Sequence, residues 1–254
     1  MVSNSVINAM YFAVFLSLII PFAILFYGLF KKKLKLSKVL ISALLFFLLR
    51  TFVVNPIANL ILLIPGINAF SDYEFVAIII TIIVISLVDI YGRKVIYSLF
   101  FKKEIEKNDG LSLGYGYGLS EIQISLCMPI LNNLSIALAI NNGTITNLVS
   151  ETTTAAELAQ AIAEYSSLEM ELFINAGITC ILILMIQVVT TFLIMKSLKT
   201  QNQNYTLISL VMIFIMNAIY YLISFFNFQL SIILVIIYII LLIYLLKKKK
   251  ISII

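Results

Sequence analysis

The stretch Leu111–Gln123, LSLGYGYGLSEIQ, lies inside a long apolar segment around which the chain is organised. It carries glycine at three alternate positions, Gly114, Gly116 and Gly118, and then a carboxylate, Glu121. Each glycine costs a helix roughly 0.5–1 kcal/mol relative to alanine. A charged group near the centre of a bilayer costs at least ~2.5 kcal/mol. Because both costs fall in one short stretch, we expect it to serve close packing or function.

The composition around this stretch is that of a membrane protein. The 254 residues are 62% hydrophobic and 11% charged, whereas a soluble domain carries about 25% charged residues. Several apolar runs reach the ~20 residues that cross the hydrocarbon of a bilayer. We therefore predict an all-α, polytopic helix bundle, a single integral-membrane domain over residues 1–254, placed as a multi-pass protein in the cell membrane. About seven transmembrane helices are expected, near 5–30, 39–64, 75–91, 111–140, 172–195, 205–225 and 230–246.

The basic residues predict the orientation of these helices. Of the 17 Lys and Arg residues, 16 fall in the stretches 31–38, 93–107, 196–199 and 247–250. Seven alternating spans place all four stretches on one side, which the positive-inside rule makes cytoplasmic. The N-terminus is then outside and the C-terminus cytoplasmic. Because the basic residues report topology, the net charge of +5 does not indicate a nucleic-acid partner; the expected partner is the lipid bilayer.

The outside loop 141–171 contains no Lys or Arg and five glutamates. Within it, Thr153–Ser167 alternates apolar and acidic residues at helical spacing, which predicts an amphipathic helix lying on the surface.

The available side chains limit the chemistry. The chain has no histidine, the commonest metal ligand and general base. Cys127 and Cys180 lie in apolar segments without a CxxC neighbour, so we interpret them as small buried residues. No metal site and no cofactor are predicted.

Three polar residues are placed at similar depth within spans. Arg50, Glu121 and Asn217 lie 10 to 12 residues into their segments, or ~15–18 Å at ~1.5 Å per residue, near the middle of a ~30 Å core. An arginine at the depth of a buried glutamate limits the cost of burying either charge. We therefore expect Arg50 and Glu121 to face one cavity, with Asn217 close by.

Asp89 and Arg93 are four residues apart, which predicts an ion pair on one helix face. Because they lie near the cytoplasmic boundary, Arg93 is interpreted as an anchor that reaches the interface, and the role of Asp89 is left open. Gly114 and Gly118 form a GxxxG motif, which is typical of close helix packing, while Gly116 points elsewhere. Glu121 is favoured as a functional group because intramembrane carboxylates usually mark sites.

With these residues in view, the sequence resembles the YhfC-type intramembrane peptidases, relatives of the CAAX-protease and PrsW class. The likeness is most specific at Gly114–Glu121, GYGYGLSE, where the family carries G-x-G-H-G-G-x-E. Ile130–Leu134 is also family-like, as is Asp89–Arg93, where the family has two glutamates, one residue, Gly and Arg.

The resemblance also implies where the chain departs from the family. Tyr117 stands at the histidine of the glycine motif, and Asp89-Ile90 stands at the paired glutamates. Asn175 and Asn217 align with two further histidines, the register at Asn175 being the looser. An amide or a phenol is a poor zinc ligand beside imidazole, so a metal-dependent activity is not expected.

Three functions remain open at this point. We favour a degenerate family member, a pseudoprotease that binds membrane-anchored peptides or partner proteins without cutting them. The alternative is an active peptidase in which Glu121 is the general base on a water and Asn217 or Asn175 donates to an oxyanion. A small transporter component is a third alternative, weakened because the chain shows no inverted repeat.

Overall fold

The structure is a computed structural model that describes residues 1–62, 74–100, 107–147, 154–223 and 226–248. All regular structure in these residues is helical, and six helices are long and apolar enough to cross a membrane. A shorter apolar helix, Gln229–Tyr244, follows them. The predicted class, an all-α membrane bundle, is confirmed. The predicted span ends at Ile64 and Phe225, and the charged residues at 102–106 and 249–250, lie outside the described residues.

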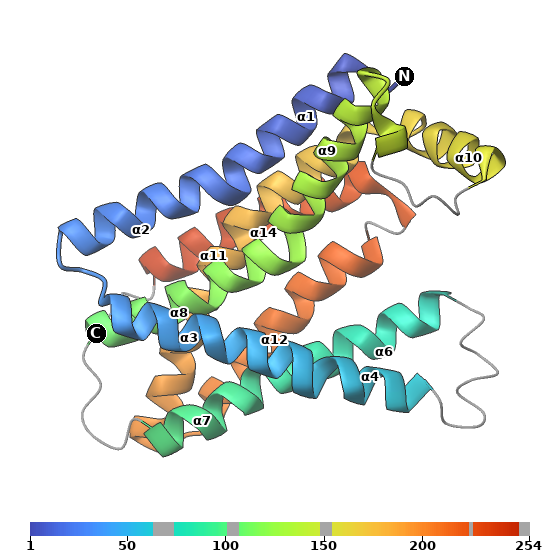
Figure 1. Cartoon of the computed structure of the whole chain (residues 1–254). Coiled ribbons are helices and arrows are strands. Elements are labelled where there is room, and N and C mark those ends of the chain that lie inside the picture. The colour runs from blue at the N-terminus through green and yellow to red at the C-terminus, as the bar shows by residue number, and fades with distance from the viewer. Residues whose placement is uncertain (63–73, 101–106, 148–153, 224–225, 249–254) are drawn as a thin grey trace.

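The six spans are continuous rods, and most are built from two α-helices joined in line (Figure 1). The pairs are α1 (Asn4–Val14) with α2 (Ile20–Phe30), α3 (Leu36–Leu49) with α4 (Asn55–Leu62), α6 (Glu74–Leu87) with α7 (Arg93–Phe100), and α8 (Lys107–Ile122) with α9 (Met128–Asn141). The fifth span is the unbroken α11 (Met170–Thr200), the sixth contains α12 (Asn204–Asn217), and the shorter helix is part of α14 (Phe228–Lys248).

Each join is a π-helical turn, at Phe15–Ile19, Arg50–Val54, Val88–Gly92 and Gln123–Cys127, and a fifth turn, Ala218–Ile223, follows α12. Three of these turns have a clear cause in the sequence, because Pro21, Pro56 and Pro129 each follow a turn by two residues. A proline cannot donate to the carbonyl four residues earlier and its ring crowds that carbonyl. The wider turn relieves the crowding, and the carbonyl of Ser17, freed by Pro21, accepts a 2.7 Å hydrogen bond from Gln123 Nε2.

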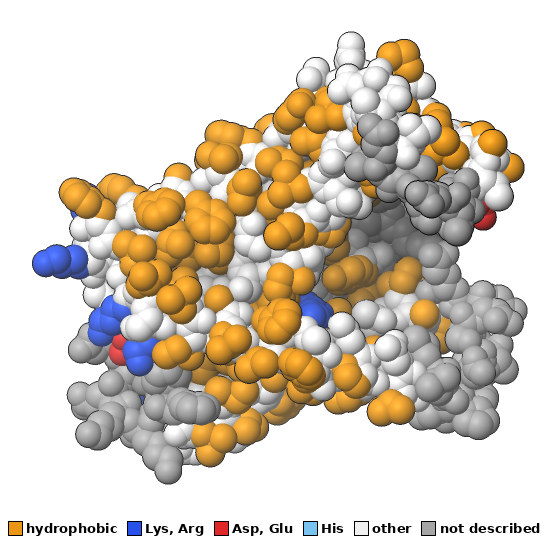
Figure 2. Space-filling view, viewed as in Figure 1, with side chains coloured by type: hydrophobic (Ala, Val, Ile, Leu, Met, Phe, Trp, Pro, Cys, Tyr) orange, Lys and Arg blue, Asp and Glu red, His pale blue; other side chains and the backbone are white. Residues whose placement is uncertain are grey.

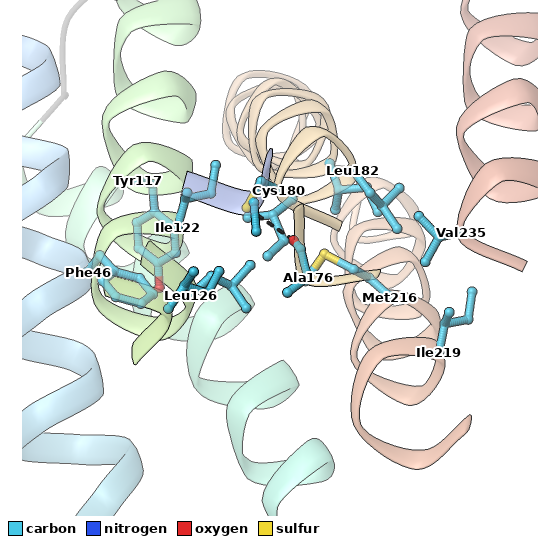
Figure 3. Packing of buried hydrophobic residues seen from close by; sticks show 14 of the residues in the cluster. Phe46, Tyr117, Ile122, Leu126, Ala176, Cys180, Leu182, Met216, Ile219 and Val235 are labelled. Atoms are coloured by element: carbon cyan, nitrogen blue, oxygen red, sulfur yellow. Dashed lines mark hydrogen bonds between the residues drawn. The ribbon is translucent and has the colours of Figure 1, made fainter. Parts of the chain in front are cut away.

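Helix α11 is the central element of the bundle. In the most apolar part of this helix 67% of residues are buried, compared with 33 to 39% in the other five spans. It packs against α1, α7, α8, α12 and α14. Figure 3 shows Phe46, Tyr117, Ile122 and Leu126 on one side of it and Met216, Ile219 and Val235 on the other. Together with Leu182 of α11 itself, all belong to one apolar core.

Helix α8 lies between α3 and α11, and its alternate glycines make this possible. A Cβ on Gly116 would lie 2.8 Å from the backbone Cα and carbonyl carbon of Val39 in α3. A Cβ on Gly114 would lie 2.6 Å from the Cα of Val188 in α11, and one on Gly118 would lie 3.1 Å from the Cβ of Gln187. As the spacing predicts, Gly114 and Gly118 share one face, which contacts α11, and Gly116 points elsewhere; the structure shows that it faces α3.

The outer surface suits a bilayer. Large apolar side chains such as Phe26, Phe52, Leu60 and Leu99 are more than 60% exposed. Figure 2 shows apolar side chains spread over the lateral face and basic side chains gathered at one end. Lipid is the medium in which such a surface is stable, so the helices imply a bilayer as partner.

The stretch predicted to form an amphipathic helix contains the helix α10 (Ala155–Ser166), which projects from the end of the bundle near α9 (Figure 1). It begins with a capping box in which Thr154 and Glu157 bond each other's backbone N–H. Tyr165 tethers it through a 3.1 Å hydrogen bond to Asn133 of α9.

Candidate functional site

Glu121 is held between two neighbouring spans. Its side chain is 4% exposed, and one carboxylate oxygen lies 3.5 Å from the guanidinium Nη2 of Arg50. The other oxygen accepts a 2.5 Å hydrogen bond from Nε2 of Gln187, in the middle of α11. The predicted pairing of Arg50 with Glu121 is therefore present. Arg50 is the first residue of a π-helical turn, and Glu121 lies one residue before the end of α8, so both charges lie close to a change from α-helical to π-helical winding.

The second carboxylate, Asp89, lies in the π-helical turn between α6 and α7 and is buried. One of its oxygens accepts a 2.7 Å hydrogen bond from the hydroxyl of Tyr117 in α8. The two carboxylates of the site are thus bound by side chains from other spans. Tyr117 is fully buried, so it belongs to the interior of the bundle.

Arg93 does not act as the predicted anchor. Its side chain is fully buried, and Nε donates a 2.6 Å hydrogen bond to the backbone carbonyl of Asp89. The two terminal nitrogens donate to Thr191 and Thr190 of α11 at 3.2 and 3.4 Å. These hydrogen bonds of Arg93 replace the ion pair that was predicted between its guanidinium and the Asp89 carboxylate. The reason is local: four residues make one turn of an α-helix, but the π-helical turn at Val88–Gly92 is wider, so the two side chains no longer share a face.

Aromatic rings join the two halves of the site. The guanidinium of Arg50 lies 5.1 Å from the ring centroid of Phe46, and that of Arg93 lies 4.2 Å from the ring of Tyr117. The rings of Phe46 and Tyr117 meet edge to face with centroids 5.1 Å apart. Two guanidiniums and two carboxylates are therefore enclosed in one connected cluster, Arg50, Asp89, Arg93 and Glu121, whose formal charges cancel. We refer to these four residues as the charged cluster.

Several buried polar atoms in and beside the charged cluster have no hydrogen-bond partner among the described residues. They are Nε of Arg50, Oδ2 of Asp89 and Oε1 of Gln187, one donor and two acceptors. Buried polar atoms without partners are rare in proteins and commonly mark a place for water or a ligand. Arg50 is also the most accessible member, with 13% of its side chain exposed. Figure 2 shows a recess between the α9–α10 and α4–α6 ends of the molecule, with a basic side chain at its inner edge.

Asn217 and Asn175 make their hydrogen bonds elsewhere. Asn217, at the end of α12, donates to Ser86 of α6 at 3.1 Å. Asn175, in α11, donates to Ser231 of α14 at 3.2 Å. The structure therefore brings Arg50, Asp89, Arg93, Tyr117 and Glu121 together, while these two asparagines each link another pair of helices.

Gln187, Thr190 and Thr191 are neighbours of the charged cluster that the sequence analysis missed. All three are fully buried on α11 and each contacts a member of the charged cluster. Their spacing holds the only available signal: residues 187, 190 and 191 lie three and four apart on one face of an apolar helix. Polar side chains repeated on one face of a span indicate contacts with a polar interior.

The sequence model of the YhfC intramembrane metalloprotease family matches residues 16–241 of the chain. The chain belongs to this family. No curated protein and no solved structure matches the chain. The charged cluster, α8 with its glycines and the central α11 all lie inside the matched residues.

The name of the YhfC family implies a metal ion, and the side chains present do not fit one. A catalytic zinc site uses three protein ligands drawn from His, Cys, Asp and Glu. The chain has no histidine, and in the described part of the chain no three such side chains are grouped. Both oxygens of Glu121 are in contact with Arg50 or Gln187, and Asp89 already accepts from Tyr117. A divalent cation would also add two positive charges to a cluster that is already balanced.

Proposed function

We propose that this member of the YhfC family is a pseudoprotease that binds membrane-anchored peptides or partner proteins in the bundle without cutting them. The observation that carries the proposal is the balance of the charged cluster. Arg50 and Arg93 supply two positive charges against Asp89 and Glu121, and in a low-dielectric interior a further cation would stand uncompensated. The two arginines thus supply the positive charge that a metal ion supplies in a metalloprotease.

The resemblance supports the same proposal. Tyr117 aligns with the histidine of the family's glycine motif, and its hydroxyl donates to Asp89, which aligns with the family's paired glutamates. Where the resemblance places two metal ligands, this chain has a hydrogen bond between two side chains. Asn175 and Asn217, aligned with further histidines, bond to serines of neighbouring helices. Each aligned position therefore has a structural partner of its own.

One observation favours an active peptidase as the second candidate. The unpartnered atoms of Arg50, Asp89 and Gln187 are suited to hold a water molecule near Glu121. Glu121 would then be the general base that takes a proton from this water. In that case a peptide bond is hydrolysed by Glu121 without a metal.

A reconstituted system separates the two candidates. The parent protein, the neutral double variant Arg50→Gln/Glu121→Gln and the surface control Glu164→Gln are placed in nanodiscs with a library of synthetic transmembrane peptides. Mass spectrometry then identifies the peptides retained and any new termini. We expect the parent and Glu164→Gln to retain a common subset that the double variant loses, with no new termini from any of them.

New termini that appear with the parent and disappear with Glu121→Gln would establish the peptidase instead. Equal retention by the parent and the double variant would show that the charged cluster is not the binding site.

A further inference from the structure

The turn between α2 and α3 displays three consecutive lysines, Lys31, Lys32 and Lys33, at the end of a span. After α2 ends at Phe30, the backbone N–H groups of Lys33 and Leu34 both donate to the carbonyl of Gly28, at 2.9 and 3.1 Å. These bonds close the helix in a compact cap of the kind that satisfies the last carbonyls. The three lysine side chains are exposed on it.

The turn is held to the bundle at two places. Leu34 is buried in a small core with Leu25, Val39 and Tyr115, and it packs where Gly28 has no side chain: a Cβ there would lie 2.8 Å from Leu34 Cγ. The next residue, Lys35, donates its N–H to Ser112 of α8 at 2.8 Å, and its ammonium pairs with Asp109 at 3.0 Å. The lysines are thus presented from a fixed backbone.

Lys32 stands in a backbone conformation that lysine does not favour. Its φ is 53°, in the left-handed region. Helix caps in this conformation usually carry glycine, or sometimes asparagine, because a Cβ there is strained. At this position Lys32 adds a third exposed charge to the turn.

The three lysines of the turn form no ion pair within the described part of the protein. No carboxylate of the described residues pairs with Lys31, Lys32 or Lys33, and the nearby Asp109 is already paired with Lys35. The Lys31 ammonium lies 5.9 and 5.8 Å from the ring centroids of Tyr27 and Phe30. These rings are 61% and 81% exposed, so the lysines sit beside an aromatic surface that faces the lipid.

We propose that the turn Lys31–Lys33 is a binding site for the phosphate of anionic phospholipids. Basic residues beside a span attract anionic headgroups, and aromatic side chains favour the headgroup level of a bilayer. Three exposed ammonium groups on one cap would surround a single phosphate while Tyr27 and Phe30 contact the acyl chains of the same lipid. This site is separate from the charged cluster and independent of the function proposed above.

The test measures thermal unfolding in a neutral detergent. A thiol-reactive dye reports unfolding because Cys127 and Cys180 are free and buried. The melting temperature is recorded against increasing dioctanoyl phosphatidylglycerol, dioctanoyl phosphatidylcholine or inorganic phosphate. The parent is compared with Lys31→Gln/Lys33→Gln and with Lys196→Gln/Lys199→Gln, which removes the same charge from another basic end.

Phosphatidylglycerol alone should raise the melting temperature of the parent and of the Lys196/Lys199 control. For Lys31→Gln/Lys33→Gln the half-saturating lipid concentration should rise about 30-fold, from ~1 kcal/mol for each lysine. Lys32→Gly should weaken the lipid response without lowering the melting temperature of the lipid-free protein. An equal response to phosphatidylcholine or to inorganic phosphate, or an equal loss in both double variants, would overturn the proposal.

Discussion

At the scale of single residues, the interior depends on the pairing of charges. Glu121 and Arg50 were predicted to meet because both lie at the same depth, and they do, at 3.5 Å. The same reasoning placed Asn217 beside them, but it bonds to Ser86 instead. Depth is readable from a sequence because helical rise is constant. The direction in which a side chain points is not, because it depends on how each rod is rotated and where it is wound as a π-helix.

Removing one charge of the pair should cost more than removing both. Arg50→Gln leaves Glu121 buried with the hydrogen bond from Gln187 as its remaining polar contact among the described residues, and we expect a loss of about 3–5 kcal/mol in the free energy of unfolding. Arg50→Gln/Glu121→Gln keeps the cluster neutral and should recover part of that loss. The measurement is a double-mutant cycle by denaturant unfolding in mixed micelles, and purely additive losses would contradict the pairing.

The hydroxyl of Tyr117 should stabilise the folded protein in addition to the contacts of its ring. Tyr117→Phe keeps the ring between Phe46 and Arg93 but leaves the buried Asp89 carboxylate without that donor. We expect the protein to lose about 1–3 kcal/mol of stability. Tyr91→Phe, on an exposed tyrosine, serves as the matched control and should change little. Equal stabilities of the two variants would show that the Asp89 contact contributes nothing.

At the scale of elements, α8 is positioned by its glycines and α10 by its cap. The GxxxG spacing was sufficient to predict a close helix contact, because residues four apart share a face. Neither the identity of the neighbouring helices nor the second contact, through Gly116, could be predicted. A glycine in the sequence indicates a close contact but not the element that makes it. The capping box of α10 was not predicted, although Thr154 and Glu157 are spaced for one.

Alanine at Gly116 and at Gly118 should rank their contacts. Gly116→Ala meets the rigid backbone of Val39, so we expect it to be the more destabilising of the two, by at least ~3 kcal/mol, as in severe overpacking. Gly118→Ala approaches Gln187 Cβ at 3.1 Å and requires a shift of a few tenths of an ångström, so it should cost less. Unfolding in micelles measures both. A greater loss for Gly118→Ala would contradict the packing of α8 on α3.

The cap of α10 should respond to acid. Hydrogen bonds from the backbone N–H and hydroxyl of Thr154 hold the pKa of Glu157 below its ordinary value. A lowered pKa in the folded state means that the cap stabilises α10 above the unfolded pKa and is lost as pH falls through the folded one. NMR titration should follow the Glu157 carboxyl in the parent and in Thr154→Ala. The substitution removes the hydroxyl donor and keeps the backbone N–H, so it should raise the pKa of Glu157; an unchanged pKa would exclude the contribution of the hydroxyl to the cap.

At the scale of the whole molecule, the helical class and the membrane environment followed from composition and long apolar runs. The orientation, with the N-terminus outside, stays a prediction from the basic stretches. The central place of α11 was not predicted, because its hydropathy resembles that of other spans. Its buried position shows only when the neighbours are known. Membership of the YhfC family leads one to expect a metal site, whereas the charged cluster consists of two arginines and two carboxylates.

The zinc content of the purified protein tests this account most directly. The parent, Glu121→Gln and Tyr117→His are purified without chelator, exposed to zinc, desalted and measured by plasma mass spectrometry. Because the charged cluster is balanced and its carboxylates are engaged, we predict a parent value far below one zinc per chain that Glu121→Gln does not change. About one zinc per chain in the parent, lost in Glu121→Gln, would contradict the account.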